Sequence, residues 1–261
     1  MKKAALVTGA ASGLGLEFSH LLARDSFDLI LVDIDGNKLG EAKEILEAKY
    51  GVNVDILHHD LSTPQVATKI YAAVKGREIE VLINNAGFGL SGFFSKTNWQ
   101  AEEAMIQLHV LTLTHLTKLI LKDMLEKKSG SIMNVSSLAA FQPGPLMAVY
   151  YATKAYILSF SEALANEVKG TGVTITVFCP GVTKTGFQGK AAQLSGSKES
   201  RINFRTISPQ AVALYGYIAM QAGKPVAIQG FQNKLTALLP RFVTRAFAVS
   251  MVRRIQEKLR E

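Results

Sequence analysis

The sequence predicts an α/β fold: a doubly wound, Rossmann-type parallel sheet of about seven strands with helices on both faces. Short apolar segments alternate along the chain with longer segments whose apolar residues recur at three- and four-residue steps, which is typical of strands alternating with amphipathic helices. The length of 261 residues suits one large domain of this kind. A glycine-rich turn directly follows the first apolar segment, as it does in dinucleotide-binding folds.

The expected strands are short, and right-handed crossovers between them imply a parallel sheet. They are Ala4–Thr8, Leu29–Asp33, Val52–Leu57, Val81–Asn84, Ser131–Val135, Val173–Phe178 and Val226–Ile228. Helices are expected at Leu14–Arg24, Lys38–Lys49 and Tyr150–Val168. Ser208-Pro209 is expected to begin another helix, as its N-cap and first-turn proline.

No linker or internal repeat interrupts this alternation, so residues 1–261 are expected to form one dinucleotide-binding and catalytic domain. The polar, basic segment 184–205 is predicted to be a mobile substrate loop. Residues 232–261 are predicted to form a basic, amphipathic C-terminal extension.

The composition excludes several classes of protein. A hydrophobic content of 48% and a single cysteine, Cys179, exclude a disordered, collagen-like or disulfide-stapled chain. A lone cysteine fits a reducing compartment, so we expect a cytoplasmic protein, with membrane association as a further possibility. Neither a signal peptide nor a membrane-spanning segment is expected: Ala4–Val7 is too short for the former, and Thr206–Gly223 contains Ser, Pro, Gln and Gly.

The net charge of +8 is distributed unevenly along the chain. Residues 1–183 hold 16 basic and 18 acidic side chains, whereas the last 78 residues hold 13 and 3. The basic excess therefore belongs to the C-terminal part. Because no nucleic-acid-reading module accompanies this excess, we expect no nucleic-acid partner.

The glycine-rich turn Thr8-Gly9-Ala10-Ala11-Ser12-Gly13-Leu14-Gly15 has the spacing TGxxxGxG. Glycines permit the tight turn from strand to helix, a close approach of the backbone to a pyrophosphate, and close packing of the helix on the sheet. The helix N-terminus favours an anion, because its N–H groups are unpaired and its dipole is positive there. The alternative is a glycine-rich turn without a ligand.

Asp33 ends the second expected strand, 18 residues after Gly15. A carboxylate at this place can accept the ribose hydroxyls of adenosine and repels a 2′-phosphate. Neither Ser12 nor Ile34 supplies the cation that a 2′-phosphate favours. NAD is therefore predicted over NADP, and the alternative is a solvated acid at a strand end.

Tyr150 and Lys154 are four residues apart and therefore share one helix face. A nearby ammonium is expected to lower the pKa of the tyrosine from about 10, which makes the phenol usable as a general acid or base. Ser137 lies 13 residues upstream, just past the fifth expected strand, and can hydrogen-bond a substrate oxygen. The carboxyl edge of the sheet should bring these residues to the glycine turn.

Taken together, these motifs resemble the short-chain dehydrogenase/reductase family, in its single-domain type. The matching features occur in the order of the family over residues 4–230. They are TGAASGLG at 8–15, Asp33, Asp60-Leu61, Asn84-Asn85-Ala86-Gly87, Asn134-Val135-Ser136-Ser137, Tyr150xxxLys154, and Pro180-Gly181 followed by Thr185.

The resemblance implies the strand order 3-2-1-4-5-6-7 and a role for each matching residue. Tyr150 would donate or accept the proton, Ser137 would orient the carbonyl or hydroxyl, and Lys154 would hold the nicotinamide ribose. The implied cofactor-binding residues are Gly9, Ser12, Gly13, Leu14, Gly15, Asp33, Asp60, Leu61, Asn85, Ala86, Gly87, Tyr150, Lys154, Thr183 and Thr185.

His109 departs from the family pattern, because the family usually has an asparagine there whose backbone carbonyl holds a relay water. The histidine could preserve the proton route, change it, mark a chain that no longer catalyses, or simply pack on the helix, and these alternatives stay open. The other histidines lack metal-ligand spacing, and no metal is predicted.

The segments expected to border the substrate are apolar and favour a lipophilic ketone or secondary alcohol. They contain Phe88, Leu90, Phe93, Phe94, Phe141, Leu146, Met147 and Phe187. The alternative is that these residues belong to the core.

The segment Arg241–Leu259 carries apolar residues at four-residue steps among basic ones. Such a helix could adsorb to anionic lipid. The favoured alternative is a helix that packs over the pocket or at a subunit interface.

The sequence thus predicts an enzyme that transfers hydride between nicotinamide and a carbonyl or secondary alcohol, and we also expect a homo-oligomer. The alternative is a non-catalytic dinucleotide-binding regulator.

Overall fold

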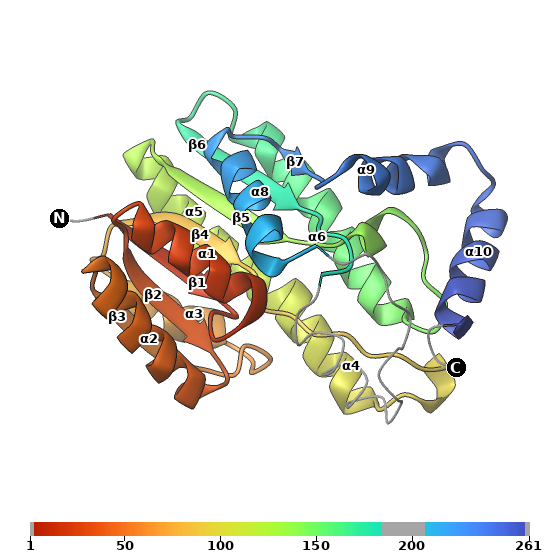
Figure 1. The fold of residues 1–261 in the computed structure, drawn as a ribbon, viewed down its shortest axis with the longest axis horizontal. Coiled ribbons are helices and arrows are strands. Elements are labelled where there is room, and N and C mark those ends of the chain that lie inside the picture. The colour runs from red at the N-terminus through yellow and green to blue at the C-terminus, as the bar shows by residue number, and fades with distance from the viewer. Residues whose placement is uncertain (1–2, 184–206, 259–261) are drawn as a thin grey trace.

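A computed structural model describes residues 3–183 and 207–258. Seven parallel strands form one sheet in the order β3-β2-β1-β4-β5-β6-β7, and helices cover both of its faces (Figure 1). The predicted fold class and strand order are confirmed. The strands are β1 (Ala4–Thr8), β2 (Asp28–Asp33), β3 (Val54–His58), β4 (Ile79–Asn84), β5 (Gly130–Val135), β6 (Val173–Phe178) and β7 (Val226–Ala227).

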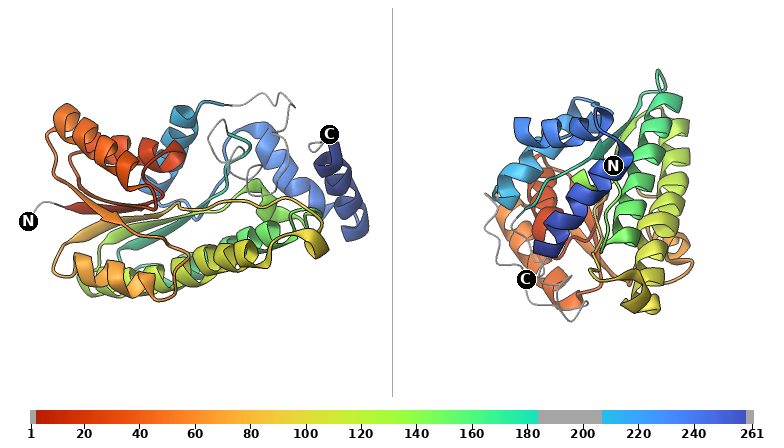
Figure 2. Two further views of the ribbon diagram at one scale, coloured as in Figure 1. Left: turned by 90° about the horizontal axis from the view of Figure 1, so that it is seen from below. Right: turned by 90° about the vertical axis from the view of Figure 1, so that its right-hand side faces the viewer.

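The helices form two layers, one on each face of the sheet (Figure 2). One layer consists of α1 (Gly13–Arg24), α2 (Gly36–Tyr50) and α8 (Pro209–Gln221), and its core includes Phe18 and Phe178. The other layer consists of α3 (Val66–Val74), α5 (Leu113–Lys127) and α6 (Ala148–Glu167). Because both faces are covered, β1 is buried at all five positions, which explains its uninterrupted apolar sequence.

The remaining elements lie at the carboxyl edge of the sheet. They are η1 (Phe94–Lys96), α4 (Trp99–Ile106), η2 (Gln107–Thr112), η3 (Leu138–Phe141), α9 (Phe231–Leu238), η4 (Leu239–Arg241) and α10 (Arg245–Lys258). The segment 184–205, predicted to be a substrate loop, lies outside the described residues, as do Thr185, Phe187 and Leu259.

Helix starts follow their local capping chemistry. Ser208 caps α8 as expected, with its Oγ accepting from the N–H of Ala211 at 3.3 Å, and Pro209 occupies the first turn. The expected C-terminal helix begins at Arg245 rather than Arg241, because the Thr244 hydroxyl caps it by accepting from the N–H of Phe247.

The helical stretch Trp99–Lys127 corrects one expectation. It is long and apolar enough, by length and composition, to cross a membrane, and the sequence analysis expected no such segment. We missed it because uncharged polar residues such as Thr112 and Thr117 interrupt its apolar ones. In the structure, Leu116 and Ile120 of this stretch pack in the core against the sheet.

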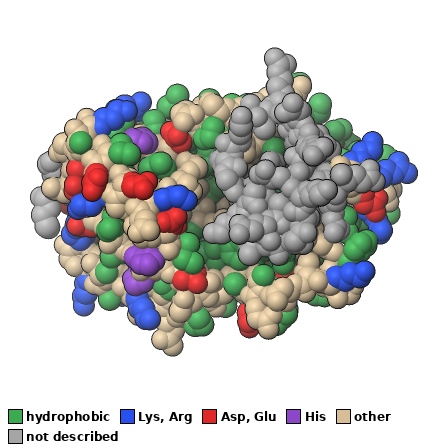
Figure 3. Space-filling model, turned by 60° about the horizontal axis from the view of Figure 1, so that its bottom comes forward, with side chains coloured by type: hydrophobic (Ala, Val, Ile, Leu, Met, Phe, Trp, Pro, Cys, Tyr) green, Lys and Arg blue, Asp and Glu red, His purple; other side chains and the backbone are tan. Residues whose placement is uncertain are grey.

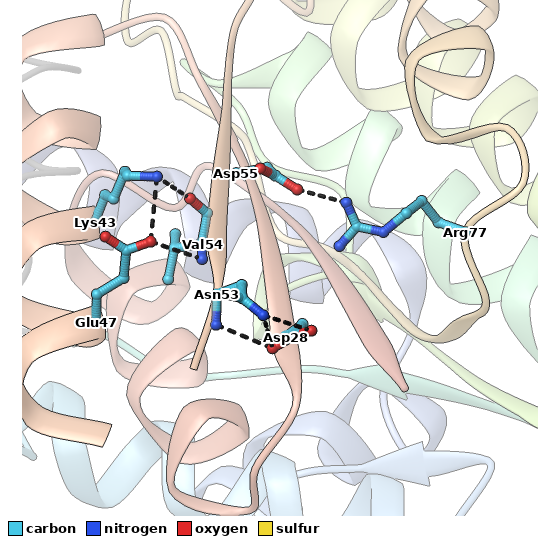
Figure 4. A network of polar contacts seen from close by, with 7 residues as sticks. All are labelled: Asp28, Lys43, Glu47, Asn53, Val54, Asp55 and Arg77. Atoms are coloured by element: carbon cyan, nitrogen blue, oxygen red, sulfur yellow. Dashed lines mark hydrogen bonds and ion pairs between the residues drawn. The ribbon is translucent and has the colours of Figure 1, made fainter. Parts of the chain in front are cut away.

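Polar contacts pin the edge strand β3 to its neighbours (Figure 4). The Asp28 carboxylate accepts from the backbone and side-chain nitrogens of Asn53 at 3.0 to 3.2 Å. Glu47 accepts from the N–H of Val54 at 3.1 Å, and Arg77 pairs with Asp55. These contacts fix the register in which the ends of β2 and β3 lie side by side, and so they also fix the position of Asp33.

Candidate active site

The glycine-rich turn joins β1 to α1 in a conformation that requires glycine. Gly9 and Gly13 have φ values of +66° and +56°, which favour residues without a Cβ. A Cβ on Gly15 would lie 2.0 Å from the carbonyl oxygen of Gly9, so the helix packs against the turn at the closest possible distance. Leu14 follows Gly13 in the first turn of α1. This backbone cradle leaves no room for side chains and matches the one a pyrophosphate needs.

Two residues at the ends of the neighbouring strands β1 and β4 hold this turn in place. The side-chain amide of Asn85 donates to the carbonyl oxygens of Thr8 and Gly9, both at 3.1 Å. In return, the Thr8 hydroxyl accepts from the backbone N–H groups of Asn85 and Ala86 at 3.0 and 3.1 Å. The end of β4 and the glycine turn are therefore one rigid unit, and Asn85 supports the turn by its side chain.

The residues predicted to bind the adenosine half lie at the same edge. Asp33 accepts from the N–H of Ala11 at 3.0 Å and from the N–H of Asp35 at 3.1 Å, so its carboxylate lies against the glycine turn. Ser12 precedes α1 in an extended conformation, and its side chain makes no capping bond, which leaves the first N–H groups of the helix for an anion. These features fit a nicotinamide dinucleotide.

Asp60 and Leu61 follow β3 and differ in their surroundings. The Asp60 carboxylate accepts from the N–H and the hydroxyl of Ser62 at 2.8 and 2.6 Å and is exposed. Leu61 is buried, and its carbonyl oxygen accepts from the Thr112 hydroxyl at 2.9 Å. Thr183, predicted for the nicotinamide half, is buried and donates to the carbonyl oxygen of Gly181 at 3.1 Å.

Ser137, Tyr150 and Lys154 meet at the carboxyl end of β5. The Lys154 ammonium is buried and donates to the Val135 carbonyl oxygen at 3.0 Å. It lies 5.8 Å from the centre of the Tyr150 ring. Ser137 is the N-cap of η3, and its hydroxyl accepts from the N–H of Ala139 at 3.1 Å.

The electrostatics of Tyr150 differ from the expectation. Burial raises the pKa of its phenol to about 12, although a hydrogen bond with Ser137 partly opposes the rise. The same burial lowers the pKa of the Lys154 ammonium to about 8. The expected lowering of the tyrosine pKa was therefore wrong, because desolvation of the phenolate is the largest effect on this group.

His109 lies in η2, a π-helical turn between α4 and α5, and its side chain is fully buried. Its Nε2 accepts from the N–H of Phe88 at 3.3 Å, so its proton must be on Nδ1. Nδ1 lies 2.9 Å from the Thr153 hydroxyl, which itself donates to the Tyr150 carbonyl oxygen at 2.8 Å. Burial, and next the Lys154 charge, hold the pKa of this histidine well below its usual value.

Gly87 makes room for this histidine. A Cβ at Gly87 would lie 2.7 Å from His109 Nε2. The neutral ring thus fills the space left by the glycine and joins the segment after β4 to the helix that carries Tyr150.

Three of the eight apolar residues predicted for the substrate side pack around Tyr150. Leu90 packs in one cluster with Tyr150, and Phe88 and Met147 lie against that cluster. Leu146 is buried and Phe141 packs on a neighbouring cluster. Phe93 and Phe94 are exposed, so the structure does not bring them into this group.

Three polar residues of the site escaped the sequence analysis as functional contributors. They are Thr8, Ser136 and Thr153. Ser136 donates to the Lys154 carbonyl oxygen at 2.8 Å and so fastens α6 to the end of β5. Each of them lies next to a recognised motif, which was the available sequence signal for a role in the site. Their hydrogen-bond partners were not predictable, because the bonds that join the site come from distant segments.

Comparison with known proteins identifies the family. A family model described as short chain dehydrogenase matches residues 3–195. The chain belongs to the short-chain dehydrogenase family and is a nucleotide-dependent oxidoreductase. This confirms the prediction of an enzyme over that of a non-catalytic regulator.

Two curated relatives illustrate the similarity. Very-long-chain 3-oxoacyl-CoA reductase-B of Danio rerio is 29% identical over 257 residues, which cover 95% of this chain and 80% of that protein. The 17-beta-hydroxysteroid dehydrogenase type 3 of Mus musculus is 34% identical over 179 residues, or 67% of this chain and 58% of that protein. The second match therefore spans little more than half of the relative.

Solved structures agree in fold. A short-chain dehydrogenase from Sphingobium yanoikuyae in complex with NADPH is 27% identical, with a TM-score of 0.82 and coverage of 93% of both chains. A structure described for its insights into 7beta-hydroxysteroid dehydrogenase stereoselectivity is 25% identical, with a TM-score of 0.84 and coverage of 96% of both chains.

The fit between Gly87 and His109 predicts a coupled pair. Gly87→Ala should lower the free energy of unfolding by about 1–3 kcal/mol, because the new methyl group overlaps the imidazole. In a His109→Ser background the same change should cost less than about 0.5 kcal/mol, since the smaller side chain leaves room. Urea unfolding of the four proteins measures both values. An equal penalty in the two backgrounds would contradict the coupling.

Proposed function

We propose that this chain transfers hydride between a nicotinamide cofactor and a lipophilic ketone or its secondary alcohol. The observation that carries the proposal is that Tyr150 and the buried Lys154, at the end of β5, share the carboxyl edge of the sheet with the glycine turn at the end of β1. A bound nicotinamide supplies the hydride in reduction and accepts it in oxidation. The protein supplies the proton, the orientation of the substrate and a site shielded from water.

In this proposal Tyr150 gives its phenolic proton to the substrate oxygen during reduction and takes it back during oxidation. Its raised pKa keeps the phenol protonated near neutral pH, which is the form needed for reduction. Ser137 hydrogen-bonds the substrate oxygen and so fixes the distance to the phenol. The Lys154 ammonium stabilises the phenolate that remains after proton transfer, and on the family pattern it also holds the nicotinamide ribose.

His109 acts in this proposal as a positioning residue. Both ring nitrogens are engaged, and a neutral imidazole with a strongly lowered pKa does not carry a proton to the substrate at neutral pH. Through the Thr153 hydroxyl it holds the backbone of Tyr150, and through the N–H of Phe88 it holds the segment after β4. The histidine thus sets the distance between the two walls of the site.

The apolar side chains around Tyr150 support a lipophilic substrate. Phe88, Leu90 and Met147 offer hydrocarbon surface rather than hydrogen bonds to a substrate next to the phenol. The relatives named above include reductases of very-long-chain 3-oxoacyl-CoA and a hydroxysteroid dehydrogenase, which supports the same class. We therefore infer a ketone attached to a long chain or a ring system.

The contacts of Asp33 support NAD as the cofactor. Its two oxygens already lie against the backbone of the glycine turn and of the residues after β2. Remaining lone pairs can accept ribose hydroxyls, whereas a 2′-phosphate would meet the carboxylate charge. The Sphingobium relative was solved with NADPH, so membership of the family does not by itself select NAD or NADP. We therefore infer the preference from local residues such as Asp33. The cytoplasmic location and the homo-oligomer stay predictions.

Turnover of a substrate panel tests the proposal. Long-chain and ring ketones should be reduced with a kcat/KM at least about tenfold above that of short polar ketones, because only the former bury apolar surface. Tyr150→Phe should lower kcat by about a thousandfold or more and leave cofactor binding unchanged, since only the proton donor is lost. Steady-state kinetics and cofactor fluorescence titration give these quantities. Better turnover of the polar set, or an active Phe variant, would refute the proposal.

The cofactor assignment predicts a defined effect at Asp33. The wild type should have a higher kcat/KM with NAD(H) than with NADP(H). Asp33→Ala should reduce that ratio by about tenfold or more, because both the ribose acceptor and the repelling charge disappear. Glu41→Ala, which removes an exposed acid of the nearby helix α2, serves as the matched control. A wild-type preference for NADP(H) would disprove the assignment.

The pKa directions predict opposite pH profiles for the two reactions. Oxidation needs the Tyr150 phenolate, so its kcat/KM should rise between about pH 6 and 9. Reduction needs the phenol and the Lys154 ammonium, so its kcat/KM should be level at first and fall above about pH 8, where the lysine loses its proton. Initial rates in both directions across this range measure the profiles. An oxidation rate that falls with pH would be inconsistent with the assigned proton acceptor.

A further inference from the structure

The C-terminal segment 231–258 presents apolar side chains to solvent more densely than the rest of the protein. Eight of the 21 large hydrophobic residues that are exposed in the described parts of the chain lie within it. Phe231 and Phe242 are 81% and 76% exposed. Single exposed apolar residues are common on soluble proteins, but a group of this density marks an interaction surface.

Helix α9 carries its exposed apolar residues along one side. Phe231, Leu235 and Leu238 follow at steps of four and three residues, and Leu239 and Phe242 continue the row past the helix end. Only Ala237 of this helix is buried. The row is therefore an outward-facing stripe and not part of the core.

Helix α10 has two apolar stripes with different surroundings. Ala248, Val252 and Gln256 are buried, and the Gln256 side chain donates to the Tyr151 hydroxyl at 3.0 Å. Phe247, Met251 and Ile255 are each one residue earlier, so they lie about 100° around the helix, and all three are exposed.

The buried side of α10 bears on whether this helix packs over the pocket, joins a second subunit or contacts lipid. Arg245 and Val249 of α10 line a cleft of about 610 Å³ together with Phe141, Pro143 and Tyr151. One side of the helix therefore packs over a cleft beside α6, and the other side is available to a partner.

Basic side chains lie among the exposed apolar ones. Arg254 and Lys258 stand three residues after Met251 and Ile255 and so share their side of the helix. The segment 231–258 holds six basic residues and one acidic residue, Glu257, which pairs with Arg253. None of the other five basic residues pairs with an acidic side chain of the described residues. Figure 3 shows Lys and Arg gathered next to hydrophobic side chains at the end of the molecule that carries α10 in Figure 1.

We propose that the exposed apolar and basic residues of 231–258, the C-terminal face, dock on the surface of an anionic lipid bilayer. Anionic headgroups attract the unpaired basic side chains, and the phenylalanine and aliphatic side chains enter the boundary of the acyl chains. A second copy fits less well, because a symmetric contact would place one basic face against another. The bond from Gln256 to Tyr151 and the buried stripe hold α10 in place before docking, so little order has to be gained on the membrane.

Sedimentation of the full chain with vesicles tests this proposal. Wild type should bind vesicles of phosphatidylcholine with about 30% phosphatidylserine at least about tenfold more tightly than pure phosphatidylcholine vesicles, and raising NaCl from about 0.1 to 0.5 M should release it. F242S/F247S and R254Q/K258Q should each lose about tenfold in binding.

Two matched variants control for the loss of apolar or basic side chains elsewhere. L214S/I218S changes two exposed residues of α8, and K118Q/K122Q changes two exposed lysines of α5. Both should bind vesicles within about twofold of wild type. Tyr150→Phe should also bind like wild type, so a failure of the proposed catalysis leaves the docking result intact.

Several outcomes would overturn the proposal. One is equal binding of wild type to both kinds of vesicle. Another is an equal loss of binding in the control variants. A third concerns the F242S/F247S variant: its mass without vesicles, measured by light scattering, is half that of wild type, while its vesicle binding is unchanged. That result would assign the C-terminal face to a contact with a second copy of the chain.

Discussion

The active site depends on the burial of one ammonium group. Lys154 lies inside the protein at the carboxyl edge of the sheet, where removing a charge from water is costly unless polar groups compensate. The Val135 carbonyl oxygen supplies one such group, and Ser136 fixes the backbone of the same lysine. The end of β5 and the start of α6 therefore lie together, because a polar group at the end of β5 compensates the buried charge that α6 carries. Tyr150, one turn earlier, takes its position from that constraint.

The same edge of the sheet contains a second rigid unit, formed by the glycine turn and the segment after β4. Asn85 and Thr8 join these two segments by reciprocal hydrogen bonds. His109 then links this unit to the first through Phe88 on one side and Thr153 on the other. The glycine turn and the helix that carries Tyr150 are thus connected by hydrogen bonds that run through a buried neutral imidazole.

The fold and the membership of the site were predictable from local patterns. The parallel sheet followed from the alternation of elements, and its strand order from the family resemblance. The glycine turn, Asp33 and Tyr150 were visible because their spacing along the chain reflects one strand, turn or helix. The contacts of His109 were not predictable, since its partners come from segments 21 and 44 residues away. The predicted direction of the Tyr150 pKa shift was wrong for a related reason. Burial is a property of the packed chain, whereas the ammonium four residues away is visible in the sequence. The apolar character of Trp99–Lys127 was missed because its polar residues were considered one by one. The mean hydropathy of the stretch is nevertheless high.

The π-helical turn at 107–112 carries a consequence for how this gene can change. A π turn holds one residue more than an α turn. Because the extra residue is absorbed within the turn, its loss would restore ordinary helical bonding and leave the later residues Leu116 and Ile120 facing the sheet. The change would instead act inside the turn, where His109 lies. A shortening by one residue here would therefore spare the fold and alter the site.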